Sequence, residues 1–459
     1  MDDIHHHVSK IKFPIHSANQ ATVKRITNET FWVAFGVFFS TIGSFAGVRL
    51  LTSVMSPGDY GRLALGVSIA MGLVYSIGMA LWGAITRFFS VAKTDGRAEW
   101  YWQSIKNILV RFGAALCIGG MVTALILKLD GFKTSEVWFW FLAILFGGVQ
   151  VVGETGSALQ NGARNRKIFS LHQNLLGWGR FIMAYVIIRL WLPGAQGAML
   201  GFVIAAIGVM LSQRYWVKKN ILKNWSKKDL KKNRSKEFFN YFKPLAFSGV
   251  FIWIQLFADR WALNSFASLD DVGIYFALYQ ISFAPALYCS SFLNHLLGPV
   301  FYSRAGDGSD QYRFEKTTVL NEKIAGFILI FIVLGVGIAF FCGHIICAML
   351  IDPKYSHGFW AFPWLVATSG IYSLGQQLLM SVYSGTDTAV FVPFRIIMMF
   401  VAIVCYMSGG IFFGFAGIIA GGFIFSVLYL FLSFFMHRRV RLSKRWISGE
   451  GNAFYNPRL

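Results

Sequence analysis

Asp259 and Arg260 are adjacent charged residues at the end of an apolar stretch, in the segment ADRWALNSFASLDDVGIYFAL at 258–278. Charge inside a membrane is costly and usually marks a substrate or ion pathway. Side chains that are neighbours in a helix point about 100° apart and form no good mutual salt bridge. Each charge therefore needs a partner of its own. We expect a paired basic gate, in which Arg260 and its repeat equivalent Arg49 face each other across a cavity near its outer end and Asp259 anchors one of them.

Ionisable residues that remain in or near apolar stretches are mostly basic. Two are acids, Glu154 and Asp259, and seven are arginines, namely Arg49, Arg62, Arg111, Arg180, Arg189, Arg260 and Arg395. Such groups face the interior of a helix bundle or a water-filled cavity rather than lipid. A cationic lumen suits an anionic ligand, and the planar guanidinium fork binds phosphate in bidentate fashion. The pattern contains no metal-ligand or cofactor motif, and we expect neither group.

Depth in the span separates the expected roles of these residues. Arg180 lies near the middle of its span, too deep to snorkel, and is expected to bind substrate. Glu154 either pairs with Arg180 on the next helix or carries a proton. Four arginines near span ends are expected to extend to the interface: Arg62, Arg111, Arg189 and Arg395.

Uncharged polar residues complete the candidate site. Those expected near the part of the cavity that the second half of the chain forms are Gln255, Asn264, Gln280, Asn294, His295, Gln376 and Gln377. The expected substrate-binding set is Arg49, Arg180, Arg260, Gln255 and Asn294. The expected ion- or proton-coupling set is Glu154, Asp259 and His295, although a buried histidine is more often structural.

The elements that position these residues are apolar helices. Of the 459 residues, 56% are hydrophobic and 14% are charged. Stretches of about 20 apolar residues cross a bilayer as helices. We predict an all-α polytopic membrane protein with twelve spans at 30–54, 62–83, 108–127, 137–160, 169–189, 197–213, 244–266, 273–301, 324–349, 360–383, 391–407 and 414–436.

Charge placement predicts the topology. With both termini inside, the inner loops hold 32 Lys and Arg residues and the outer loops hold three. This is the positive-inside bias, and it accounts for most of the net charge of +21. Nucleic acid is therefore not an expected partner. The first 29 residues lack the apolar core of a signal peptide, and the five cysteines fall within spans with no CxxC pair.

Two halves of the chain are weakly similar to each other. The stretch RLLTSVMSPGDYGRLALG begins at Arg49, and its counterpart RWALNSFASLDDVGIYFAL begins at Arg260. Six spans per half place both halves in the same orientation, which predicts two lobes related by a parallel pseudo-twofold axis around a central cationic cavity. The expected units are an N-terminal segment at 1–29, an N-lobe at 30–213, a basic linker at 214–243, a C-lobe at 244–436 and a basic tail at 437–459.

These motifs resemble those of a known transporter family. The first repeat, followed by GMALWGAITRFFS, and the second, followed by GPVFYSR, are similar to the polysaccharide-transport and O-antigen flippases. These belong to the multidrug, oligosaccharidyl-lipid and polysaccharide (MOP) exporter superfamily. The short inner stretch SALQNGARNRK also fits. The resemblance covers essentially the whole chain and is strongest in the first, second, seventh and eighth spans.

The resemblance implies a transporter rather than an enzyme. It would move an undecaprenyl-pyrophosphate-linked oligosaccharide, such as an O-antigen repeat unit for lipopolysaccharide, from the inner to the outer leaflet of the bacterial inner membrane. Implied partners are this lipid, membrane lipids, and a polysaccharide polymerase with its chain-length regulator. Alternatives are a lipid-linked cell-wall precursor flippase, a cation-coupled multidrug exporter, and a membrane enzyme such as a polymerase or glycosyltransferase. Excess arginine disfavours the drug exporter, and short outer loops disfavour the enzyme.

Overall fold

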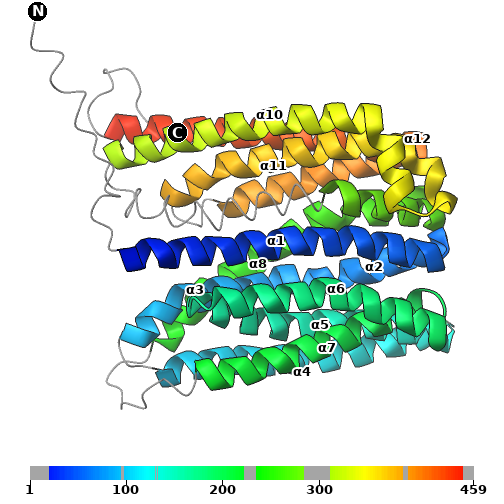
Figure 1. Ribbon diagram of the computed structural model, residues 1–459, viewed down its shortest axis with the longest axis horizontal. Helices are drawn as coiled ribbons and strands as arrows, with labels where there is room; N and C mark the ends of the chain where they lie inside the picture. The colour runs from blue at the N-terminus through cyan, green and yellow to red at the C-terminus, as the bar shows by residue number, and fades with distance from the viewer. Residues whose placement is uncertain are drawn as a thin grey trace, which may run out of the picture.

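The computed structural model describes residues 20–94, 98–129, 131, 133–221, 234–283, 311–385 and 391–447. Every regular element within these ranges is a helix, and eight of the helices are long and apolar enough to cross a membrane. The helices run side by side in one bundle (Figure 1). The chain is therefore an all-helical, multi-pass membrane protein, as the composition predicted.

The first half of the chain forms a group of helices that includes one π-helical segment. Its α4, α5, α6 and α7 lie on one side of the bundle, while α1 and α2 lie toward the centre (Figure 1). The bounds are α1 (Gln20–Val54), α2 (Pro57–Leu73), the π-helix η2 (Val74–Gly78), α3 (Met79–Thr94), α4 (Ala98–Leu129), α5 (Thr134–Gly162), α6 (Arg166–Leu190) and α7 (Ala195–Asn220).

The second half places α10, α11 and α12 on the opposite side, with α8 toward the centre (Figure 1). Residues 269–283 are also helical. The bounds are α8 (Ser235–Phe266), α10 (Gln311–Leu350), the 3₁₀-helix η4 (Pro353–Ala361), α11 (Phe362–Gly385) and α12 (Phe391–Ile447). The helix α12 covers the last two predicted spans and is kinked at Gly414, whose φ is 54°.

The predicted spans coincide with helices wherever the structure describes them, but the count of twelve stays a prediction. Part of the predicted span at 273–301 lies outside the described residues, as does 222–233 in the predicted linker. Helices also extend beyond the predicted limits, since α8 begins at Ser235 and α12 continues to Ile447. The predicted domain limits therefore stay predictions.

The two repeats share one helix cap. Ser56 caps α2, with the Asp59 backbone N–H donating to its hydroxyl at 3.1 Å and the hydroxyl donating to the Asp59 carboxylate at 2.8 Å. Ser268 and Asp271 make the same pair of contacts at 3.1 and 2.7 Å. This reciprocal arrangement satisfies helix N-terminal donors that would otherwise lack partners. The matched spacing in the sequence therefore encodes a matched local structure.

The two lobes meet closely at one end of the bundle, which we call the distal end because it lies opposite the start of α1. There the Asp352 backbone N–H donates to the Thr52 hydroxyl at 3.2 Å, and the Tyr355 hydroxyl donates to the Met55 carbonyl at 3.1 Å. These contacts join η4 and the residue before it to the end of α1. The distal end is closed in this structure.

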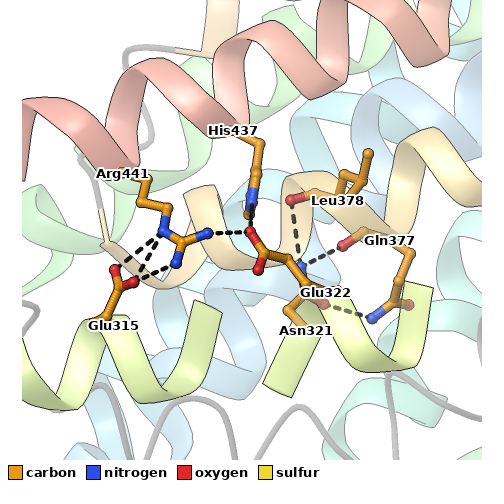
Figure 2. Close-up of polar contacts among 7 residues, drawn as sticks. All are labelled: Glu315, Asn321, Glu322, Gln377, Leu378, His437 and Arg441. Atoms are coloured by element: carbon orange, nitrogen blue, oxygen red, sulfur yellow. Dashed lines mark hydrogen bonds and ion pairs between the residues drawn. The ribbon is translucent and has the colours of Figure 1, made fainter. Parts of the chain in front are cut away.

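At the opposite end of the C-lobe, a charged network joins α10 to α12 (Figure 2). Arg441 donates to the carboxylates of Glu315 and Glu322, and His437 Nε2 lies 3.0 Å from Glu322 Oε1. Next to it, the Asn321 side chain donates to the Gln377 carbonyl at 3.0 Å. The sequence predicts a basic tail at 437–459, and this helix-to-helix contact was not predicted.

Replacing Arg441 with methionine is expected to lower stability. Glu315 and Glu322 would then lose their shared cation, at a cost of about 1–2 kcal/mol because the pairs are only partly buried. Thermal unfolding of the purified protein in detergent measures this. The control is Arg438→Met, which removes an exposed arginine whose guanidinium carbon lies 5.2 Å from the Phe434 ring centroid. Equal effects from the two variants would contradict a specific role for the network.

Candidate substrate and ion sites

Arg260 is buried in a cage of aromatic rings. Only 2% of the residue is exposed. Its guanidinium carbon lies 4.5 Å from the ring centroid of Phe257, 5.2 Å from that of Phe276 and 4.6 Å from that of Tyr279. Aromatic faces stabilise a cation electrostatically, more strongly when water is excluded. The Nε and Nη1 atoms have no hydrogen-bond partner among the described residues, so this buried cation keeps donors to offer.

Asp259 has partners other than Arg260's side chain. One carboxylate oxygen accepts from the Tyr275 hydroxyl at 2.7 Å, and the other accepts from the Arg260 backbone N–H at 2.7 Å. Within the described residues no salt bridge joins the two adjacent side chains. Asp259 holds the backbone and the facing helix beside the arginine, and its carboxylate also stabilises the nearby guanidinium electrostatically.

The aromatic cage reaches both lobes. Phe257 contacts Tyr75 of η2, with ring centroids 5.9 Å apart, and Phe276 contacts Tyr60 of α2 at 5.3 Å. The Tyr60 hydroxyl also accepts from Gln280 at 2.8 Å. Separation of the lobes would therefore break ring contacts on two of the three walls around the arginine.

Arg180 approaches the same interface from the N-lobe. It is partly buried, with its guanidinium carbon 4.6 Å from the Phe181 ring centroid and 5.7 Å from that of Phe202. It also lies close enough to the Tyr60 hydroxyl to interact with it electrostatically. Tyr60 thus interacts with Arg180 and contacts the cage around Arg260. The structure brings these two predicted substrate-binding residues to one region.

Arg49 lies elsewhere. Its side chain is exposed, and Nη1 donates to the Ile351 carbonyl at the end of α10. The predicted pairing of Arg49 with Arg260 across a cavity is not seen, since each has its own contacts. Arg49 instead adds to the hydrogen bonds that join the lobes at the distal end.

Glu154 faces a cavity within the N-lobe. This cavity measures about 420 Å³ and is lined by Glu154 with residues of α1, α2, η2, α3 and α6. No Lys or Arg is among the lining residues, and Glu154 makes no ion pair with any described residue. Of the two predicted roles, pairing with Arg180 is not observed. A role as a proton or ion carrier stays open.

The remaining candidates lie in the C-lobe. Gln255 is 1% exposed and donates to the Tyr372 hydroxyl at 3.1 Å. Arg395 is 6% exposed and donates to the Tyr429 hydroxyl at 3.3 Å. The prediction that Arg395 snorkels is therefore wrong, because its side chain turns into the lobe core. Asn294 and His295 lie outside the described residues.

Hydrogen bonds from two tryptophans join the lobes and were not predicted from the sequence. Trp253 Nε1 donates to the Ser68 carbonyl at 2.7 Å, and Trp261 Nε1 donates to the Ser68 hydroxyl at 3.0 Å. The indole N–H of tryptophan usually finds a hydrogen-bond partner when it is buried, and a serine in an otherwise apolar facing span was the available signal.

Comparison with solved structures shows the fold. The lipid II flippase MurJ in an inward closed conformation aligns with a TM-score of 0.65 at 14% identity, covering 92% of this chain and 93% of that one. A variant of the Vibrio cholerae MATE transporter VcmN aligns at 0.63, with 16% identity and coverage of 92% and 98%. A MOP-superfamily transporter from Pyrococcus furiosus aligns at 0.62, with 13% identity and coverage of 92% and 96%.

At such identities the likeness shows the fold alone, which is the two-lobed helical fold of MOP-superfamily transporters and flippases. A search of curated proteins gives no match. The model of one protein family, described as polysaccharide biosynthesis protein, matches residues 26–303, which is more than half of the chain. The resemblance of these motifs to polysaccharide-transport proteins is thereby confirmed. The chain belongs to the polysaccharide biosynthesis protein family.

Proposed function

We propose that this protein is a flippase that moves an undecaprenyl-pyrophosphate-linked oligosaccharide, such as an O-antigen repeat unit, from the inner to the outer leaflet of the bacterial inner membrane. Both termini would lie inside, which makes the distal end the outer side. The observation that carries the proposal is the buried Arg260 cation, which keeps unused donors at the contact between the lobes. A pyrophosphate supplies the acceptors that those donors lack.

The proposed cycle is alternating access. In the structure described here the lobes are joined at the distal end, and the cage around Arg260 is closed by Tyr75 and Tyr60 of the other lobe. When the lobes separate, these ring contacts break and the guanidinium becomes available to the lipid pyrophosphate. Arg180, near Tyr60, is the second cation of this anion site. Two guanidinium groups give charge-assisted hydrogen bonds to both phosphates.

A complementation experiment tests the proposal. In a strain lacking this gene we expect surface polysaccharide to be lost and then restored by the wild-type chain. Arg180→Ala at equal expression should fail to restore it, because one phosphate partner is removed. The matched control is Arg189→Ala, which removes an exposed arginine on the same helix and should complement fully.

Other results would redirect the assignment. Unchanged polysaccharide with increased drug sensitivity in the deletion strain would identify a multidrug exporter. A block in cell-wall synthesis with normal surface polysaccharide would identify a cell-wall precursor flippase. Full complementation by Arg180→Ala would exclude this arginine from the substrate path. Association with a polymerase and a chain-length regulator stays part of the proposal.

A further inference from the structure

A second, much smaller cavity is also lined by Glu154. It measures about 10 Å³, the room needed for one water molecule or one small ion. It is enclosed by α5, α6 and α7 of the N-lobe, and half of its lining is polar. The polar lining residues are Gln150, Glu154, Ser157, His172, Gln173 and Gln213. A polar cavity of this size is built to hold one small occupant.

Gln213 presents an unused oxygen to this cavity. The residue is 4% exposed, its Nε2 donates to the Ser157 hydroxyl at 2.8 Å, and its Oε1 has no hydrogen-bond partner among the described residues. A buried acceptor without a donor costs about 1–3 kcal/mol. The free oxygen therefore indicates an occupant that supplies a proton or a positive charge.

Two glycines in the segment GETG allow the Gln213 side chain to lie close to α5. A Cβ added at Gly156 would lie 3.1 Å from Gln213 Oε1, and one added at Gly153 would lie 3.5 Å away. The amide of α7 therefore lies directly over the backbone of α5 on either side of Glu154. The glutamine oxygen and the Glu154 carboxylate line the same cavity.

His172 adds polarity without adding charge. Its Nδ1 lies 2.9 Å from the Ile168 carbonyl, so Nδ1 is the protonated nitrogen, and Nε2 accepts from the Ser212 hydroxyl at 3.0 Å. Both ring nitrogens are thus occupied in the neutral form. The other titratable group at the Glu154 cavities is Tyr75, which lines the larger one. Glu154 therefore brings the one formal charge among the residues that line the two cavities.

We infer that the pocket formed by Glu154, Gln213 and Ser157 binds a small monovalent cation, either Na⁺ or a proton held on the carboxylate beside a bound water. An intramembrane carboxylate needs a compensating charge, and no described residue pairs with Glu154. Glu154 also lines the 420 Å³ cavity, so its carboxylate borders both spaces. This inference rests on the proposed function and adds to it a binding site for a coupling ion.

Direct binding measurements on the purified full-length chain in detergent, without substrate, test the inference. One arm measures ²²Na⁺ binding at fixed pH, and the other measures the infrared absorption of a protonated carboxyl across a pH series without sodium. We expect a signal in one arm. Glu154→Gln should abolish the signal. Gln213→Leu should lower the affinity for Na⁺ at least tenfold or, in the proton arm, raise the proton concentration at the titration midpoint at least tenfold. Ser157→Ala should weaken binding by a smaller factor.

A matched control is Gln160→Leu, which removes a buried glutamine from the same helix as Glu154, outside the lining of both cavities, and should leave cation binding unchanged. If the wild type gives no signal in either arm, or if the signal survives Glu154→Gln, the pocket holds water only and the inference is wrong. Because the assay contains no lipid substrate, its failure leaves the flippase proposal standing. Conversely, a cation site in a chain that fails the polysaccharide test would leave this inference standing alone.

Discussion

A Gly273→Val variant is expected to fold but to lose transport, because the lobes cannot close at the distal end around a side chain at this position. A Cβ at Gly273 would lie 1.9 Å from the Pro57 carbonyl and 2.9 Å from the Gly61 nitrogen. Gly61 is its counterpart in the first repeat, and a Cβ there would lie 2.1 Å from the Leu269 carbonyl. The obstructing atoms belong to the backbone of capped helix starts, so they cannot turn aside as a side chain would.

Forcing atoms into such a contact costs about 1–3 kcal/mol or more, which lowers the population of the closed state by roughly 10- to 100-fold. Alternating access requires each state to be reached in turn, so surface polysaccharide should fall toward the level of the deletion strain. The clash is confined to the closed state, and the chain should still be inserted at normal abundance.

Disulfide cross-linking across the closed end distinguishes this effect from misfolding. Cysteines at Thr52 and Asp352, which are in hydrogen-bond contact between the lobes, should cross-link in the wild-type background and not with Gly273→Val. The control is Gly326→Val on α10, where a Cβ would meet no atom within 4 Å. Wild-type transport by Gly273→Val would show that this contact is not required in the cycle.

The helices and the internal repeat could be predicted because their signals are local. A span is encoded by its own apolar residues, and the cap at Ser56 and Asp59 recurs at Ser268 and Asp271 with the same spacing. Hydropathy and capping need no knowledge of neighbouring helices. The structure and the family match therefore agree with the sequence on fold and family, although the limits of the lobes stay untested.

The surroundings of the charged residues could not be predicted in the same way. Arg260 is enclosed by rings from its own helix and from the following helical segment, and those rings are held in turn by the other lobe. Arg395 lies near the start of α12. Its position near the end of a predicted span suggested that its side chain extends to the membrane interface. Its side chain instead donates to Tyr429, which follows it by 34 residues across the Gly414 kink. Depth in a span is readable from sequence, whereas the face a side chain occupies depends on how helices pack.

The polar pocket behind Glu154 illustrates the same limit. Glu154 was a candidate from sequence because it is an acid within a span, but Gln213 and His172 lie on other helices and are individually unremarkable. Their relation to Glu154 depends on close contact of α5 with α7, which the glycines of GETG permit. Small residues at helix contacts are recognisable in a sequence, yet they do not identify which partner approaches.

Replacing Arg260 with methionine is expected to abolish polysaccharide transport. The aromatic cage would accept an unbranched apolar side chain, but the buried Asp259 would lose a neighbouring cation, so a loss of stability is expected as well. The pyrophosphate would lose charge-assisted hydrogen bonds worth about 1.5–3 kcal/mol each, so affinity for the lipid should fall by roughly 10- to 100-fold or more. Thermal unfolding and complementation, measured on the same variant, separate the two effects.

Arg260→Lys distinguishes the charge from the shape of the guanidinium. Lysine keeps the positive charge against the rings but lacks the planar fork for bidentate phosphate binding, so we expect partial transport, between that of methionine and wild type. A lysine variant as inactive as the methionine variant would indicate that fork geometry, rather than charge, controls recognition. Full transport by Arg260→Met would show that the caged cation stabilises the interface between the lobes and does not handle the substrate, which would remove the observation on which the flippase proposal rests.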